Sequence, residues 1–80
     1  MAQPCGYSEG SHSPGQAYFT YWNNCGDSSE YINVDTVWWP DFKKCVRPHS
    51  TLTLGAGGTN SVGDVRGATY LWSGCSPTDN

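Results

Sequence analysis

Four cysteines are the residues of this 80-residue chain with the most obvious covalent chemistry: Cys5, Cys25, Cys45 and Cys75. Successive cysteines are 20, 20 and 30 positions apart, so the chain lacks the close pair that a zinc site usually needs. An even number of cysteines in a short chain is typical of disulfides, for which the sequence alone permits three connectivities. We therefore expect two disulfides, each contributing about 3–4 kcal/mol in the chain-entropy model. Their presence predicts an oxidising environment and a secreted protein.

Carboxylates and histidines do not form a recognisable catalytic set. Four carboxylates lie on or near one predicted strand, where a pair could act as general acid and base: Asp27, Glu30, Asp35 and Asp41. No histidine or nucleophile accompanies them at a telling spacing. His12 and His49 lie in predicted loops, where we expect solvated side chains and no bound metal. The sequence therefore predicts no enzyme, no metal site and no cofactor.

Aromatic residues are the strongest indication of a binding surface. Trp38 and Trp39 are adjacent, so in a strand their side chains point to opposite faces. If Trp38 packs inward, Trp39 lies outside with Tyr31, and Tyr18 or Trp22 of the neighbouring strand extends that outer surface. Exposed Trp and Tyr side chains are typical interface residues, so this aromatic face is the predicted binding site. The alternative is that loops fold over the outer face and bury both tryptophans.

One long stretch of alternating residues positions these aromatics. Residues 30–39, EYINVDTVWW, place Ile32, Val34, Thr36 and Trp38 on one side of an extended chain. A period of two, rich in β-branched and aromatic residues, predicts a central strand whose inner face packs in the core. On this alternation Trp38 is a core residue, and its removal is expected to cost about 3–5 kcal/mol.

Five shorter strands are expected around this central one, over residues 5–8, 16–22, 43–47, 51–54 and 69–72. Turn residues separate them, and the glycine-rich stretch 55–67 is expected to be mostly loop, with a brief edge strand over 62–65. No helical periodicity is present. The fold class is thus predicted to be all-β, a small disulfide-pinned six-stranded antiparallel β-sandwich. It forms a single domain over 1–80, with residues 76–80 as a frayed tail.

Charge and hydropathy exclude two classes of partner. The net charge is −3, with only four lysines and arginines. Nucleic-acid binding requires a basic face, so we expect no nucleic-acid partner. The longest apolar run is far shorter than a transmembrane helix, so we expect no membrane span.

With its cysteines and strands placed, the chain resembles the tendamistat family, secreted α-amylase inhibitors of streptomycetes. The resemblance spans residues 5–75 and rests on an aromatic strand before Asn24-Cys25, an alternating strand before Cys45, Pro48 soon after it, and ATYLWSGC before the tail. It implies a six-stranded β-sandwich with disulfides Cys5–Cys25 and Cys45–Cys75. The pattern CGY…AYF…NNC…CVRP…TLG is also similar, more loosely, to small secreted actinomycete proteins of unestablished role encoded near natural-product genes.

The inhibitory motif of the tendamistat family is missing from this chain. Those inhibitors insert a Trp-Arg-Tyr turn, located between their first two cysteines, into the acidic amylase cleft. Here the segment between Cys5 and Cys25 contains no lysine or arginine. Neither Trp22 nor His12 replaces the bidentate, charge-assisted hydrogen bonds of an arginine to carboxylates. The resemblance therefore implies the fold, while inhibition of α-amylase is expected to be weak or absent.

These observations predict a secreted, non-enzymatic protein-binding module that is inhibitor-like in fold and has a changed target, such as another glycosidase. One alternative is an adaptor or accessory subunit of a larger secreted complex of the toxin type, held by an edge strand or by the aromatic face. A second alternative is a carrier of, or accessory protein for, an aromatic natural product, because sandwiches of this size can hold a small aromatic ligand against tryptophans.

Overall fold

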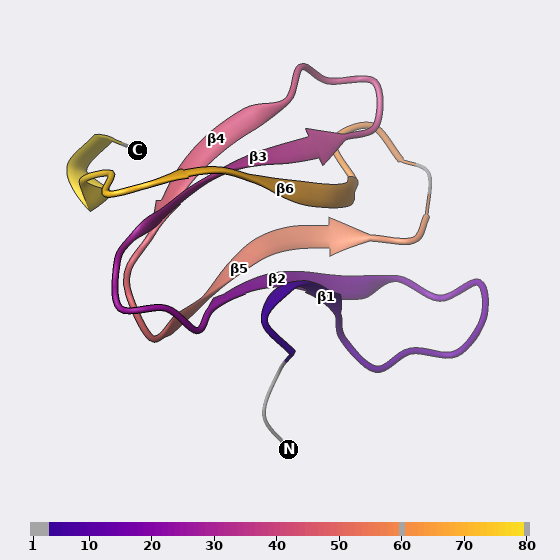
Figure 1. The fold of residues 1–80 in the computed structure, drawn as a ribbon. Coiled ribbons are helices and arrows are strands. Elements are labelled where there is room, and N and C mark those ends of the chain that lie inside the picture. The colour runs from indigo at the N-terminus through magenta and orange to yellow at the C-terminus, as the bar shows by residue number, and fades with distance from the viewer. Residues whose placement is uncertain (1–3, 60, 80) are drawn as a thin grey trace.

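The chain folds into two three-stranded antiparallel sheets that pack face to face (Figure 1). A computed structural model describes residues 4–59 and 61–79. The elements are β1 (Gly6–Glu9), β2 (Tyr18–Asn24), β3 (Glu30–Thr36), β4 (Phe42–Val46), β5 (Ser50–Gly57), β6 (Val65–Ser73) and a short 3-10 helix, η1 (Pro77–Asp79). One sheet has the order β1-β2-β5 and the other β4-β3-β6. The predicted all-β, six-stranded sandwich is confirmed.

The connections bring two loops together at one end of the sandwich. Two of them, β1–β2 and β3–β4, are hairpins within a sheet, and the other three pass from one sheet to the other. In Figure 1 the β3–β4 loop and the β5–β6 loop lie side by side, beyond the end of β3. The β4–β5 turn and the C-terminal η1 are at the opposite end of β4. The molecule measures 36 × 32 × 16 Å, and its thin dimension is that of two packed sheets.

The inner face of β3 forms the centre of the core. Ile32 and Val34 are 0% exposed and Thr36 is 3% exposed, so the predicted alternation is confirmed over this part of the strand. Val46 and Val65 from the flanking strands complete this side of the core. Because the core is small, each of these side chains carries a large share of the buried apolar area.

Trp22 supplies the largest side chain of the core, which corrects its predicted place on the outer aromatic face. It is only 7% exposed, and its β2 neighbours Thr20 and Asn24 are fully buried. The even-numbered residues of β2 therefore face the other sheet. At the edge of the core the Trp22 indole N–H donates a hydrogen bond to Oε1 of Glu30 (3.0 Å), so its polar atom remains satisfied.

The central strand ends three residues earlier than predicted. β3 stops at Thr36, and Val37, predicted to face outward, is 7% exposed. Trp38, predicted to lie in the core, is 83% exposed. The reason is that Val37 pairs with the β5–β6 loop, after which Trp38 adopts a positive φ of 66° and breaks the alternation.

β2 extends beyond its predicted end at residue 22 and finishes at Asn24. The Asn24 side chain is buried, and its amide donates to the carbonyls of Ser28 (2.8 Å) and Val46 (3.1 Å). Its Oδ1 accepts a hydrogen bond from the Gly26 N–H (2.9 Å). One asparagine thus ties the β2–β3 turn to β4, which lets a polar residue occupy an inward strand position.

The glycine-rich stretch between Leu54 and Thr69 contains more strand than predicted. β5 continues to Gly57 and β6 begins at Val65. The predicted edge strand over 62–65 is wrong, because Val62 and Gly63 form a turn. The glycines of this stretch therefore lie partly inside strands as well as in the connecting loop.

Two disulfides fasten the ends of the chain. Cys5 is joined to Cys25 and Cys45 to Cys75, the pairing that the resemblance implies. The first bond links the residue before β1 to the residue after β2, and the second links β4 to the segment after β6. Beyond it η1 lies beside β4, in the region predicted to be a frayed tail. Asn80 lies outside the described residues.

Unreduced peptide mapping with trypsin tests this pairing. Cleavage after Lys43, Lys44 and Arg66 should release residues 1–43 as a fragment with its own internal disulfide, because Cys5 and Cys25 both lie within it. Residues 45–66 should remain linked to residues 67–80 until a reductant is added. Either alternative connectivity would link the first fragment to both of the others, and that result would contradict the topology.

Candidate functional site

Exposed apolar side chains gather where the two loops meet. Trp38 and Trp39, in the β3–β4 loop, are 83% and 63% exposed, and Val62, in the β5–β6 loop, is 58% exposed. We call these three residues the tryptophan tip. Trp38 is the most exposed large hydrophobic side chain among the residues that the structure describes. An apolar cluster this exposed is typical of an interaction surface.

Backbone hydrogen bonds hold the two loops of the tryptophan tip together. The Val37 N–H donates to the Asp64 carbonyl, and the Gly63 N–H donates to the Val37 carbonyl, both at 2.8 Å. The Asp64 carboxylate in turn accepts hydrogen bonds from the Thr59 N–H (2.9 Å) and hydroxyl (2.6 Å). The β5–β6 loop is therefore closed on itself and pinned to the end of β3.

A buried threonine holds the β3–β4 loop from below. The Thr36 hydroxyl, at the last inward position of β3, donates to the Trp39 carbonyl (2.9 Å) and to the Pro40 carbonyl (3.3 Å). Pro40 also restricts the backbone of the residue before it, Trp39, to extended conformations. Both tryptophans therefore project from a constrained backbone.

Gly63 gives Trp39 a surface to pack on. A Cβ atom at Gly63 would lie 3.4–3.6 Å from three carbons of the Trp39 ring, so the ring lies against the glycine backbone. Gly63 also has a φ of +88°, which glycine adopts without strain. One side of the Trp39 ring is thus supported by the protein, and the side chain is still 63% exposed.

Trp38 has an unfavourable backbone conformation and an exposed side chain. Its φ of 66° lies in the left-handed region, which is an outlier for a bulky residue and costs on the order of 1–3 kcal/mol. The indole also remains almost fully in water, so no burial offsets that cost. Strained residues of this kind concentrate at functional sites.

A fixed negative charge lies beside the tryptophan tip. Asp41 follows Pro40, and its carboxylate accepts a hydrogen bond from the Asn33 side-chain amide (3.0 Å). That hydrogen bond lowers the pKa of Asp41, with a further lowering from the positive charge of Arg66. Arg66 itself is paired with Asp35 at 3.1 Å. Asp41 is therefore ionised at neutral pH.

The predicted aromatic face is not a single surface. Tyr31 lies on the outer face of β3, where its ring meets that of Trp72, with 5.0 Å between the ring centroids. Of the four predicted residues, only Trp39 belongs to the tryptophan tip. Trp72 pairs with Tyr31 at the end of β3 that is remote from the tip.

Tyr18 lies in the other sheet and has a local structural role. Its ring stacks on His12, with 4.0 Å between the centroids. Its hydroxyl donates to Glu9 Oε2 (2.9 Å), a hydrogen bond that raises the pKa of Tyr18. With Trp22 in the core, Tyr18 and Trp22 do not extend the surface around Tyr31.

Edge strand β6 carries a second set of exposed apolar residues: Tyr70, Leu71 and Trp72. Two adjacent residues of β3 pair with Tyr70 and Trp72, so Leu71 between them has no partner on β3 and forms a bulge. Arg66 is skipped in the same way and forms a second bulge. Bulges twist an edge strand and hinder its pairing with another chain. We therefore place the candidate binding site at the tryptophan tip and not on this edge.

Titratable side chains are dispersed and tied to separate partners. His49 Nε2 lies 2.7 Å from Asp27 Oδ1, while Glu30 accepts the indole hydrogen bond of Trp22. Within residues 4–59 and 61–79, no three His, Cys, Asp or Glu side chains are grouped so that they could hold a metal ion. Over the same residues, no helix is long and apolar enough to cross a membrane.

The fold and site define a small, two-disulfide β-sandwich with an exposed aromatic turn. The chain belongs to DUF6355, a family of unknown function, whose model matches residues 3–75. The matched region includes all four cysteines and both loops of the tryptophan tip. Comparisons with curated proteins and with solved structures gave no match.

The ionisation of Asp41, beside the tryptophan tip, can be tested through the hydrogen bond that its carboxylate accepts from Asn33. We expect NMR titration to give a pKa for Asp41 below the ordinary value of 3.8. Because folding lowers this pKa, the stability it contributes is present above the ordinary pKa and is lost as the pH falls through the folded value. Asn33→Ala should raise the pKa of Asp41, because the hydrogen bond is the main cause of the shift.

Thr69→Ala is the matched control, because Thr69 is the β6 partner of Asn33 and makes no hydrogen bond to Asp41. It should leave the pKa of Asp41 where it is in the unmodified protein. An Asp41 pKa that does not respond to Asn33→Ala would contradict the arrangement of this flank.

Proposed function

We propose that this protein is a secreted, non-enzymatic binding module that inserts its tryptophan tip into an apolar depression on a partner protein. The observation that carries the proposal is Trp38, which is 83% exposed while its backbone is held at a positive φ. Neither property stabilises the sandwich. Both are understandable if the side chain is buried by a partner.

The tryptophan tip has the properties of an interface hot spot. Tryptophan is among the residues that contribute most to protein–protein affinity, chiefly when a pocket of the partner removes it from water. The loops are already ordered by Val37, Thr36 and Gly63, so binding requires little additional loss of conformational entropy. Because the tip projects from the end of the sandwich, the partner must supply the concave surface.

Charge favours one kind of partner surface. Asp41 is ionised beside the tip, and the protein carries a net charge of −3. An anionic membrane would repel this end of the molecule, whereas basic side chains around a partner's pocket would attract it. The acidic cleft of an α-amylase would also be unfavourable. An inhibitor-like role, suggested by the resemblance to the tendamistat family, would therefore need a different target.

Two disulfides support the secreted location, because they persist in oxidising compartments. An adaptor subunit of a larger secreted complex is a variant of the same proposal, since it would use the same tip on a permanent partner. Nothing at the tip favours catalysis. The carboxylates near it, Asp35, Asp41 and Asp64, are each engaged with a neighbouring side chain.

Affinity capture with matched baits tests the proposal. The unmodified protein and the double variant Trp38→Ala, Trp39→Ala are immobilised and exposed to the culture medium of the producing organism. We expect a stoichiometric protein on the first bait that is absent from the second. With that partner in hand, Trp38→Ala should weaken binding by about 2 kcal/mol, roughly 30-fold in Kd. Its unfolding free energy should change by less than about 0.5 kcal/mol.

Phe19→Ala is the control for general stickiness. Phe19 is 60% exposed but is not part of the tip, and on β2 it faces away from the β4-β3-β6 sheet, so its removal should leave the affinity unchanged. A partner that binds the double variant as tightly as the unmodified protein, or that loses affinity only with Phe19→Ala, would refute the tip as the binding surface.

A further inference from the structure

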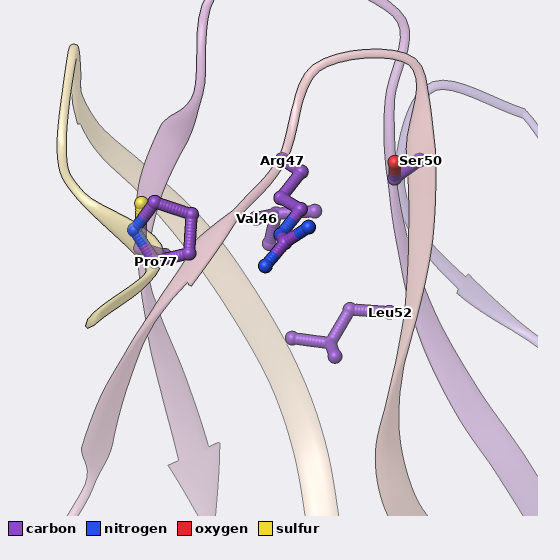
Figure 2. Close-up of a pocket in the computed structure, with 6 residues that line it drawn as sticks. Val46, Arg47, Ser50, Leu52 and Pro77 are labelled. Atoms are coloured by element: carbon purple, nitrogen blue, oxygen red, sulfur yellow. The ribbon is translucent and has the colours of Figure 1, made fainter. Parts of the chain in front are cut away.

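A pocket of about 250 Å³ lies at the end of the molecule opposite the tryptophan tip. It is formed where β4 ends, β5 begins and η1 packs beside them (Figure 2). The lining residues are Cys45, Val46, Arg47, Ser50, Leu52 and Pro77. None of them belongs to the tip, so a function for this pocket is independent of the function proposed above.

The walls of the pocket are mostly apolar. Val46 is 2% exposed and is part of the core, and Leu52 packs against that core. Pro77 closes the side formed by η1. Figure 2 shows the Arg47 side chain extending between Pro77 and Leu52, and Arg47 is an exposed residue, so its charged end lies beside these apolar groups and remains open to solvent.

Arg47 has no partner for its charge. Among the residues that the structure describes, it forms no ion pair and no side-chain hydrogen bond. Arg66, by contrast, is paired with Asp35. A guanidinium offers a planar fork of N–H donors that fits a carboxylate bidentately.

Ser50 does not provide a second hydrogen-bond donor to the pocket. Its hydroxyl proton is used in a hydrogen bond to the Pro48 carbonyl (3.1 Å), so toward the pocket its oxygen can only accept. Recognition of an anion in this pocket therefore depends on Arg47. The apolar walls can receive only a non-polar group on the same ligand.

We propose that this pocket binds a small organic acid, with the carboxylate on the Arg47 guanidinium and an apolar group against Val46, Leu52 and Pro77. The volume is below the range of pockets for drug-sized molecules, about 300–1,000 Å³, so the ligand has about one ring. Burial of the apolar group beside the ion pair lowers the local dielectric and strengthens the charge interaction. A ligand of this size binds with a Kd on the order of 1 mM.

NMR titration with phenylacetate as the probe tests the pocket. We expect saturable shifts of the Leu52 methyl groups and of the Arg47 side chain. Phenylacetamide, which has the same shape without the charge, should bind at least about tenfold more weakly, equivalent to about 1.4 kcal/mol. Arg47→Gln should reduce phenylacetate binding to a similar degree.

Two control variants show whether phenylacetate binds at this pocket or elsewhere on the surface. Arg66→Gln and Trp38→Ala should leave phenylacetate binding unchanged, because neither residue lines the pocket. The proposal is overturned if phenylacetamide binds as well as phenylacetate, or if inorganic phosphate produces the same shifts at the same concentration. Absence of saturable Leu52 shifts at about tenfold above the expected Kd would also overturn it.

Discussion

Two backbone hydrogen bonds between Val37 and the β5–β6 loop determine how this sandwich ends. They draw Val37 into a buried position and stop β3 at Thr36. The next residue, Trp38, then has no inward position to occupy and turns outward through a positive φ. The same pair of bonds fixes Gly63 where the Trp39 ring can lie on it. The exposed tryptophans are thus a direct consequence of the way the β3–β4 loop is joined to the β5–β6 loop, which connects the two sheets.

This arrangement is costly for a protein of 80 residues. A tryptophan can bury on the order of 150–250 Å², and a domain of this size has little apolar area to spare. Only Trp22 of the four tryptophans is placed in the core, while Trp38, Trp39 and Trp72 are exposed. Two disulfides compensate for the small core by restricting the unfolded chain. Stability is therefore provided by crosslinks, and large aromatic groups are left for contacts outside the molecule.

The sequence predicted the features that depend on local periodicity. Alternation placed Ile32 and its strand neighbours in the core, whereas the disulfide pairing came from a family resemblance and not from spacing. Trp38 was misplaced because its position is set by a contact with residues far along the chain, and strand periodicity contains no information about it. The sequence also placed Trp22 on the outer face of β2, whereas it lies on the inner face. Polar Thr20 and Asn24 face inward because buried hydrogen bonds satisfy them, so the face that contains Trp22 does not look apolar in sequence.

The proposed binding role requires a tryptophan tip that is ordered before any partner binds. Backbone ¹⁵N relaxation of the free protein measures this most directly, at the amides of Trp38 and Trp39 with Ile32 as the rigid reference. We expect order parameters near those of rigid strands, about 0.85, at all three amides. Values below about 0.6 at Trp38 and Trp39 would show a flexible loop and would contradict a pre-formed binding surface.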